Sequence, residues 1–118
     1  MSEIHAGLGE RWNALSRARQ ILNIVSELTR TSNSVARGNP ERSRSSLERA
    51  LELVDFTLDD RAQWSGNRLR ELARWRELLA EFYIAPTQSN EQLHLLIHAL
   101  LTLDAEAANS LPRALIGR

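Results

Sequence analysis

The sequence predicts an all-α protein, an antiparallel up-down four-helix bundle with a long first helix. Apolar residues recur at the three- and four-residue spacing of amphipathic helices through almost the whole chain. Sustained alternation and hairpin turns of the Asn-Gly or Asp-Gly type, which are signals of strands, are nearly absent. Short breaks separate four periodic segments, and short connections place consecutive helices antiparallel.

The length and composition fit a single helical domain over residues 1–118. The chain has 118 residues, of which 42% are hydrophobic and 25% are charged, which is the balance of a globular protein. A domain of this size buries about two-thirds of the surface of its unfolded chain, enough for a core without disulfides or metals. We expect residues 1–8 and 110–118 to be loose tails.

The sequence contains no targeting or membrane segment that we recognise. The first residues lack the basic region and the apolar run of a signal peptide, and no stretch approaches the ~20 apolar residues of a spanning helix. The absence of cysteine excludes disulfides and thiolate metal sites. We therefore expect a cytoplasmic protein.

The first two helices are predicted from Gly9 to Arg37 and from Pro40 to Asp60. Gly38 is the expected C-terminal cap, because glycine enters the left-handed conformation without strain. Asn39 is then the expected N-cap and Pro40 the first helical residue, where its missing N–H costs nothing. The apolar stripes of these helices are formed by Leu8, Trp12, Leu15, Ala18, Ile21, Leu22, Ile24, Val25, Leu28 and Val35, and by Leu47, Ala50, Leu51, Leu53, Val54 and Leu58.

The third helix is predicted from Asn67 to Ile84 and the fourth from Glu91 to Asn109. A polar break precedes the third helix, and Trp64 within it is expected to pack back onto the bundle. Ser89 or Asn90 is the expected cap of the fourth helix. The inward stripes are formed by Leu69, Leu72, Ala73, Leu79, Ala80, Tyr83 and Ile84, and by Leu93, Leu96, Ile97, Leu100, Leu101, Leu103 and Ala107.

Motifs of catalysis are missing from the sequence. The glycines are isolated, so neither Walker nor Rossmann spacing occurs, and there is no nucleophile elbow. His94 and His98 are four residues apart on one helix face and are weak candidates for a metal site, but no carboxylate with ligand spacing shares their stripe. We therefore expect no enzymatic activity and no cofactor, with both histidines in solvent.

The charge balance argues against a non-specific nucleic-acid binder. Fifteen basic and fifteen acidic residues give a formal net charge of zero, whereas such binders need a basic excess. Arg37, Arg42, Arg44 and Arg49 nevertheless gather at the corner between the first two helices, where a contact with RNA or an acidic partner is one interpretation. No aromatic residue lies among them to stack bases, so we expect a solvated corner.

Two charged residues fall within apolar stripes. Arg76 lies near the centre of the third stripe and Asp104 near the centre of the fourth. Because an unpaired buried charge costs several kcal/mol, each must find a partner or reach solvent. A structural ion pair is the simpler interpretation, and the alternative is that Arg76 meets a ligand carboxylate in a groove.

Apolar residues outside the main stripes predict the binding surface. Phe56 lies opposite the stripe of the second helix, and Trp75, Leu78 and Phe82 lie to one side of the third stripe. Such residues either pack against a second layer or form an exposed patch that binds a partner. We expect these four residues, with Arg76, to bind a partner.

The favoured function is a non-enzymatic helical protein-interaction module, such as an export chaperone or adaptor, that binds partner helices or forms a homodimer. Neither a membrane nor a nucleic acid is an expected partner. The alternative is a small-ligand or metal-binding helical bundle that uses Arg76, Asp104 or the pair His94 and His98.

Two segments carry a family resemblance. Residues 36–39 (Ala-Arg-Gly-Asn) end the first helix, and residues 48–54 (Glu-Arg-Ala-Leu-Glu-Leu-Val) follow in the second. Residues 65–67 (Ser-Gly-Asn) then lead into a helix with Trp75 and Phe82. This order resembles the bacterial flagellin-export chaperones (FliS type) across residues 16–110, although the family's Tyr-containing N-terminal segment and its Leu-Tyr pair are not found. The resemblance implies a chaperone whose outer hydrophobic grooves accept a segment of an export substrate.

Overall fold

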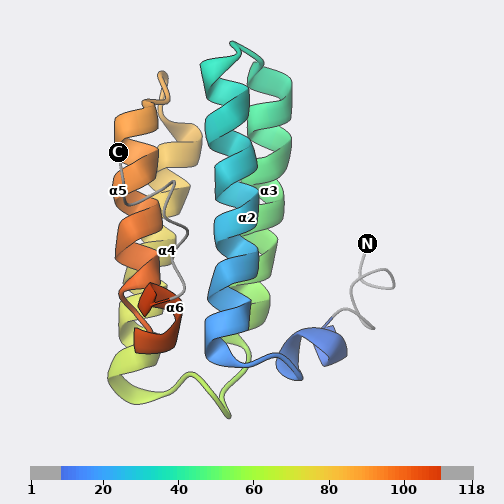
Figure 1. The fold of residues 1–118 in the computed structure, drawn as a ribbon, viewed down its shortest axis with the longest axis vertical. Coiled ribbons are helices and arrows are strands. Elements are labelled where there is room, and N and C mark those ends of the chain that lie inside the picture. The colour runs from blue at the N-terminus through green and yellow to red at the C-terminus, as the bar shows by residue number, and fades with distance from the viewer. Residues whose placement is uncertain (1–8, 110–118) are drawn as a thin grey trace.

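The computed structural model of the protein describes residues 9–109, and the predicted tails at residues 1–8 and 110–118 lie outside the described residues (Figure 1). The described part of the chain is helical and contains no strand, which confirms the predicted all-α class. A helical turn over residues 9–13 precedes the named helices. These are α2 (Arg17–Ala36), α3 (Pro40–Leu58), α4 (Gly66–Ile84), α5 (Asn90–Leu101) and α6 (Ala105–Asn109).

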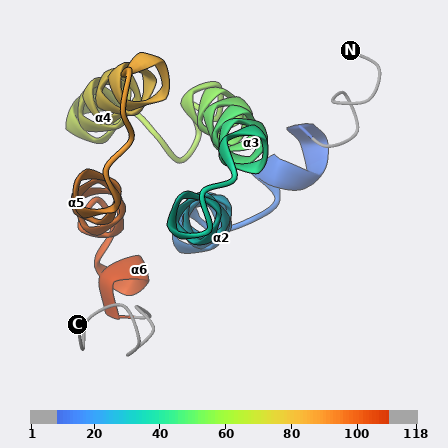
Figure 2. The same cartoon turned by 90° about the horizontal axis from the view of Figure 1, so that it is seen from above.

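The four long helices α2 to α5 lie side by side, and each runs opposite to the one before it (Figure 1). Helix α2 packs against α3 and α5, and α4 packs against the same two helices. Seen from above, α2 and α3 lie on one side of the molecule and α4 and α5 on the other (Figure 2). The short α6 contacts α2 and α5.

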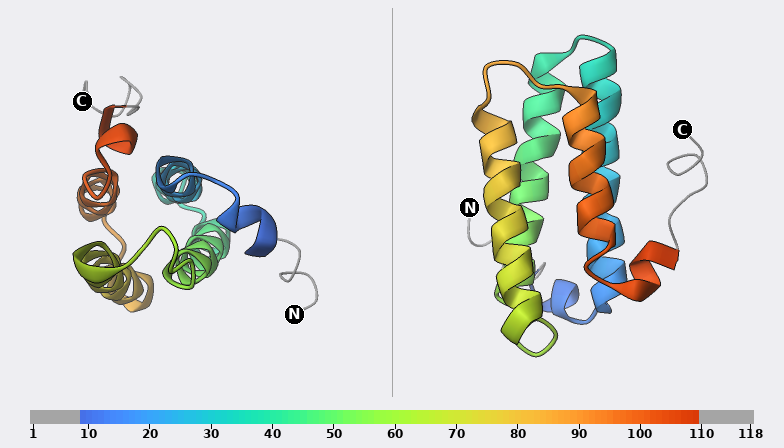
Figure 3. Two further views of the ribbon diagram at one scale, coloured as in Figure 1. Left: turned by 90° about the horizontal axis from the view of Figure 1, so that it is seen from below. Right: turned by 90° about the vertical axis from the view of Figure 1, so that its left-hand side faces the viewer.

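The predicted long first helix is wrong, because the chain leaves the helix between Ala14 and Ser16. Ser16 has an extended backbone, and its Oγ accepts the backbone N–H of Arg19 as the N-cap of α2. The preceding helical turn is bonded to α3, since Trp12 Nε1 donates a 2.9 Å hydrogen bond to Thr57 Oγ1 of that helix. Figure 3 shows this turn beside the lower end of α3. With 20 residues, α2 is therefore hardly longer than α3 or α4, with 19 each.

The predicted fourth helix is also divided. Helix α5 ends at Leu101, and α6 begins after Asp104. The Oδ2 atom of Asp104 accepts the backbone N–H groups of Glu106 and Ala107, which is the hydrogen bonding of an N-cap. An aspartate side chain that accepts backbone N–H groups in this way competes with the backbone hydrogen bonds that would continue α5, so the chain starts a new helix at this point.

The corner between α2 and α3 follows the prediction. Gly38 has a φ of +68°, in the left-handed region that glycine enters without strain. Asn39 caps α3 by accepting the backbone N–H of Arg42, and Pro40 is the first helical residue. Ser89, one of the two predicted caps of the next corner, accepts the N–H of Gln92.

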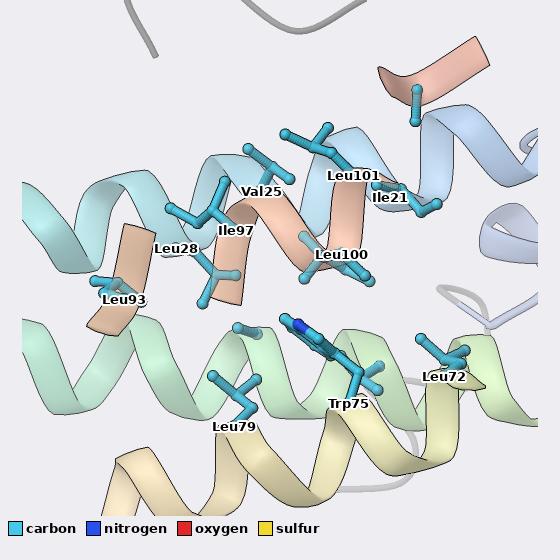
Figure 4. Close-up of a cluster of buried hydrophobic side chains, with 14 of the residues drawn as sticks. Ile21, Val25, Leu28, Leu72, Trp75, Leu79, Leu93, Ile97, Leu100 and Leu101 are labelled. Atoms are coloured by element: carbon cyan, nitrogen blue, oxygen red, sulfur yellow. The ribbon is translucent and has the colours of Figure 1, made fainter. Parts of the chain in front are cut away.

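The hydrophobic core lies between the four long helices and includes all three tryptophans. Figure 4 shows Trp75 of α4 pointing toward Leu100 of α5. Trp64, in the loop between α3 and α4, is fully buried, which confirms the prediction that it packs back onto the helices. Further core residues are Trp12, Ile21, Ile24, Val25, Leu28, Leu47, Val54, Leu72, Leu93, Ile97 and Leu101.

A buried polar network joins the start of α2 to the α3–α4 loop. The carboxamide of Gln20, which is fully buried, donates to Asp60 Oδ2 at 2.9 Å and to the backbone oxygen of Trp12 at 3.0 Å. Its oxygen accepts the Nε1–H of Trp64 at 2.8 Å. Gln63 Nε2 supplies a second donor to Asp60 Oδ2. The network satisfies buried groups that the broken first helix would otherwise leave unpaired.

Candidate functional site

The aromatic side chains predicted to bind a partner are part of the core. Trp75 is 3% exposed and Phe82 is 5% exposed. Trp75 Nε1 also donates a 2.8 Å hydrogen bond to the backbone oxygen of Leu96 in α5. The expected exposed patch is therefore wrong for these two residues, because α4 packs against both α3 and α5 and must bury a wide apolar face.

Phe56 packs against a second layer instead of facing solvent. It is partly buried against the core. A Cβ atom added at Gly9 would lie 3.4 Å from its ring, so the helical turn before α2 covers Phe56 closely. Of the four apolar residues predicted to bind a partner, Leu78 is the exposed one, at 47%.

The two charged residues of the apolar stripes form ion pairs between elements. Arg76 of α4 donates through Nε and Nη2 to both carboxylate oxygens of Asp55 in α3, at 3.1 and 3.3 Å. Asp104 accepts from Arg17 Nε at 3.2 Å while it caps α6. Both residues thus have structural partners, in agreement with the simpler of the two interpretations.

The two histidines that were weak candidates for a metal site lie on α5. His94 and His98 are exposed, and His94 Nε2 lies 3.1 Å from Ser32 Oγ. Within residues 9–109 no three His, Cys, Asp or Glu side chains are placed to hold one ion.

An apolar groove runs between α4 and α5, the two helices nearest the viewer in Figure 3 (right). Its volume is about 500 Å³. It is lined by Leu78, Glu81, Phe82, Ala85, Gln92, Leu95, Leu96 and Ala99. The lining includes Leu78 and Leu95, the latter 70% exposed, and also Phe82, which is buried. Ile84 of α4, which the sequence predicted to point inward, is 76% exposed.

Leu95 was missed by the sequence reasoning, although a signal for it existed. The buried residues of α5 are Leu93, Ile97, Leu100 and Leu101, which define its inward stripe. Leu95 lies two residues from both Leu93 and Ile97, on the other side of the helix. A large apolar residue in that position has no core to enter and is left at the surface.

A second hollow, of about 670 Å³, lies between α2 and α3 near their connecting corner. It is lined by Arg30, Asn33, Ser34, Arg37, Asn39, Arg42, Ser45, Ser46 and Arg49. Three of the four arginines predicted at this corner are present, and Arg30 joins them. Arg44 faces elsewhere: its guanidinium lies 5.2 Å from the ring centroid of Tyr83 and donates to Tyr83 Oη.

Tyr83 has the clearest electrostatic perturbation in the described chain. Its hydroxyl donates a 2.6 Å hydrogen bond to the Glu48 carboxylate. This bond, with partial desolvation, raises the pKa of Tyr83 above its ordinary value of 10.0, while Arg44 opposes the rise. The hydrogen bond links α4 to α3. The raised pKa of Tyr83 lies far from the range of a catalytic acid or base at neutral pH.

None of the helices in the described residues combines the length and apolar character needed to cross a membrane. Comparison with known proteins adds no further constraint on the groove or the hollow: no family model, no curated protein and no solved structure matches this chain.

Proposed function

We propose that the protein is a non-enzymatic helical interaction module whose groove between α4 and α5 binds a helix of another protein. One observation carries the proposal: the large hydrophobic residues exposed in the described part of the chain, Leu78, Ile84 and Leu95, all lie on α4 and α5. An apolar patch concentrated beside a groove is typical of a protein-binding surface. The four long helices act in this proposal as the up-down bundle that the sequence predicts.

The spacing of the lining residues fits a helical occupant. On α4 and its C-cap they follow the pattern 78, 81, 82, 85, and on α5 the pattern 92, 95, 96, 99. Each pattern is one straight stripe of i, i+3, i+4 and i+7 positions, so two parallel ridges flank a channel about 10 Å long. An amphipathic helix places its own i, i+3 and i+4 anchors into such a channel.

The charge of the groove favours a partner helix with basic flanks. Among the described residues that line the groove, Glu81 is the one with a charged side chain. In a two-fold pairing of two copies across this groove, each copy would bring a Glu81 carboxylate to the interface and no basic residue of the described lining to pair with it, and an unpaired charge at a dry interface is unfavourable. A heterologous helix with Arg or Lys beside its apolar stripe is therefore preferred to a second copy.

The test is selection of helical peptides from a display library against the purified protein, followed by measurement of the affinity of the selected peptides. We expect amphipathic peptides with basic flanks, and a loss of binding of at least about tenfold with Leu95→Glu or Leu78→Glu. Ala62→Glu adds the same charge at an exposed loop position and is the matched control. If the selected peptides bind Leu95→Glu and Leu78→Glu as tightly as the wild type, the groove is not their binding site and the proposal is refuted.

Oligomeric state separates the proposed occupant from a second copy. We expect a monomer in sedimentation experiments. A dimer that Leu95→Glu dissociates would mean that the groove binds another copy of this chain.

The predicted role as an export chaperone or adaptor, in a bacterial cytoplasm, belongs to the same proposal. It is supported by the helix order over residues 16–110 and by a groove of the kind that accepts a helical segment. Binding of a flagellin segment to the wild type but not to Leu95→Glu would support this role. If no flagellin segment binds, the export-chaperone role is wrong and the groove binds a different protein.

A further inference from the structure

The hollow between α2 and α3 is built from the same pattern on both helices. Helix α2 with its C-cap contributes residues 30, 33, 34 and 37, and α3 contributes residues 42, 45, 46 and 49, with the N-cap Asn39 between the two sets. Each stripe begins and ends with arginine and has short polar residues between them. Because i, i+3, i+4 and i+7 positions share a helix face, four guanidinium groups surround one polar hollow.

The positive charge of this hollow is incompletely neutralised. Among residues 9–109, Glu27 is the carboxylate that contacts its arginines, with Arg30 Nη1 at 2.8 Å and Arg49 Nε at 3.4 Å. It therefore offsets one of four charges. Within residues 9–109 the guanidinium groups of Arg37 and Arg42 have no ion-pair or hydrogen-bond partner, and no acidic residue lines the hollow.

Short polar donors stand between the arginines. The side chains of Asn33, Ser34 and Ser45 make no hydrogen bond within the described residues, so their donors are available to a ligand. Ser46 is different: its hydroxyl accepts from Thr31 and donates to backbone oxygens of α3, so it forms part of the contact between the helices.

The ends of the helices do not supply the charge. The C-terminus of α2, at Arg37, and the N-terminus of α3, at Pro40, meet at the same corner. Their partial charges are opposite in sign and largely cancel. The attraction for an anion therefore comes from the guanidinium groups, which match the oxygens of a phosphoryl group with two parallel hydrogen bonds.

The lining also indicates the size and type of the anion. A volume of about 670 Å³ is within the usual range of small-ligand sites and exceeds the needs of a single phosphate. In the part of the chain that the structure describes, no aromatic residue lines the hollow to stack a base. The chain has no net charge to attract the extended backbone of a nucleic acid.

From these observations we infer that the α2–α3 hollow is a binding site for a small anion that carries two or more phosphoryl groups. Arg37 and Arg42 hold the anion from opposite helices, and Arg30 and Arg49 exchange part of their contact with Glu27 for it. The hydroxyl and amide donors between them bind the remaining oxygens. The site lies on a different pair of helices from the apolar groove (Figure 2) and does not depend on the function proposed for that groove.

The test is calorimetric titration of the full chain with inorganic tripolyphosphate and pyrophosphate, at a constant ionic strength of about 0.15 M. We expect saturable binding of one anion per chain. Orthophosphate and sulfate are expected to bind at least about tenfold more weakly, because each engages fewer guanidinium groups. The variant Arg37→Gln/Arg42→Gln is expected to weaken tripolyphosphate binding by about a hundredfold, or about tenfold per guanidinium.

The matched control is Arg68→Gln/Arg74→Gln, which removes two exposed arginines of α4. We expect its affinity within about twofold of the wild type, since screened surface charges act weakly at this distance. Leu95→Glu is likewise expected to bind the anion normally. Urea unfolding checks that Arg37→Gln/Arg42→Gln is folded, which we expect because neither guanidinium has a structural partner among residues 9–109.

Three results would overturn the inference. The first is equal binding by Arg37→Gln/Arg42→Gln and by the control variant. The second is sulfate binding as tight as that of tripolyphosphate. The third is single-stranded RNA or a phosphopeptide that binds through these arginines more tightly than tripolyphosphate, which would assign the hollow to a macromolecule.

Discussion

Replacing Gln20 by methionine removes the centre of the buried network that joins α2 to the α3–α4 loop. Methionine has nearly the same length and volume, so the substitution deletes hydrogen bonds without leaving a cavity. The Nε1–H of Trp64 then has no acceptor, and Trp64 is fully buried. Asp60 keeps Gln63 Nε2 as a donor but loses the shorter of its two side-chain hydrogen bonds.

The magnitude follows from these groups. An unpaired buried donor costs about 1–3 kcal/mol, and a hydrogen bond to a charged group contributes about 1.5–3 kcal/mol. The backbone oxygen of Trp12 also loses a partner. We therefore expect Gln20→Met to lower the free energy of unfolding by about 3–5 kcal/mol, out of the roughly 5–15 kcal/mol typical of a domain.

Urea unfolding followed by tryptophan fluorescence measures this loss, since all three tryptophans are buried and report on the folded core. Gln92→Met replaces an exposed glutamine and is the matched control, with an expected change within about 0.5 kcal/mol. Trp64→Phe removes the other partner, and a double-mutant cycle with Gln20→Met is expected to give a coupling of about 1–3 kcal/mol. Additive losses, or a loss below about 1 kcal/mol for Gln20→Met, would refute the reasoning.

The remaining predictions concern the groove and Tyr83. Trp75→Ala is expected to lower the free energy of unfolding in urea by about 3–5 kcal/mol, because the ring is part of the core. Leu95→Ser, at an exposed position, is expected to change it by about 0.5 kcal/mol or less. Similar losses for both variants would contradict the burial of Trp75 and the exposure of Leu95. Tyr83 is the chain's single tyrosine, so absorbance at alkaline pH reports its ionisation directly. Because its folded pKa is raised, its contribution to stability is present below the unfolded value of 10.0 and is lost as the pH rises through the folded pKa. Glu48→Gln is expected to lower that pKa, and an unchanged titration would exclude Glu48 as the cause.

Some features follow from the sequence because their causes are local. The corner at Gly38, Asn39 and Pro40 depends on the conformational freedom of one glycine, one capping amide and one missing N–H, and the structure has it as predicted. Helical periodicity likewise identifies the all-α class, since the spacing of apolar residues is a property of each helix alone. Of the four arginines predicted to gather at this corner, Arg37, Arg42 and Arg49 line the same hollow and Arg44 does not.

Other features were decided by contacts between distant segments. The breaks at Ser16 and Asp104 are stabilised by Thr57 on α3 and by Arg17 at the start of α2, which periodicity cannot reveal. A wide apolar face on α4 can mean either two neighbouring helices or an exposed patch, and only the packing of α3 and α5 around it buries Trp75. The sequence by itself therefore determined which segments are helical and how the α2–α3 corner is capped. Tertiary structure decided where the helices break and which apolar residues remain for a partner, because burial depends on what the rest of the chain places against each face.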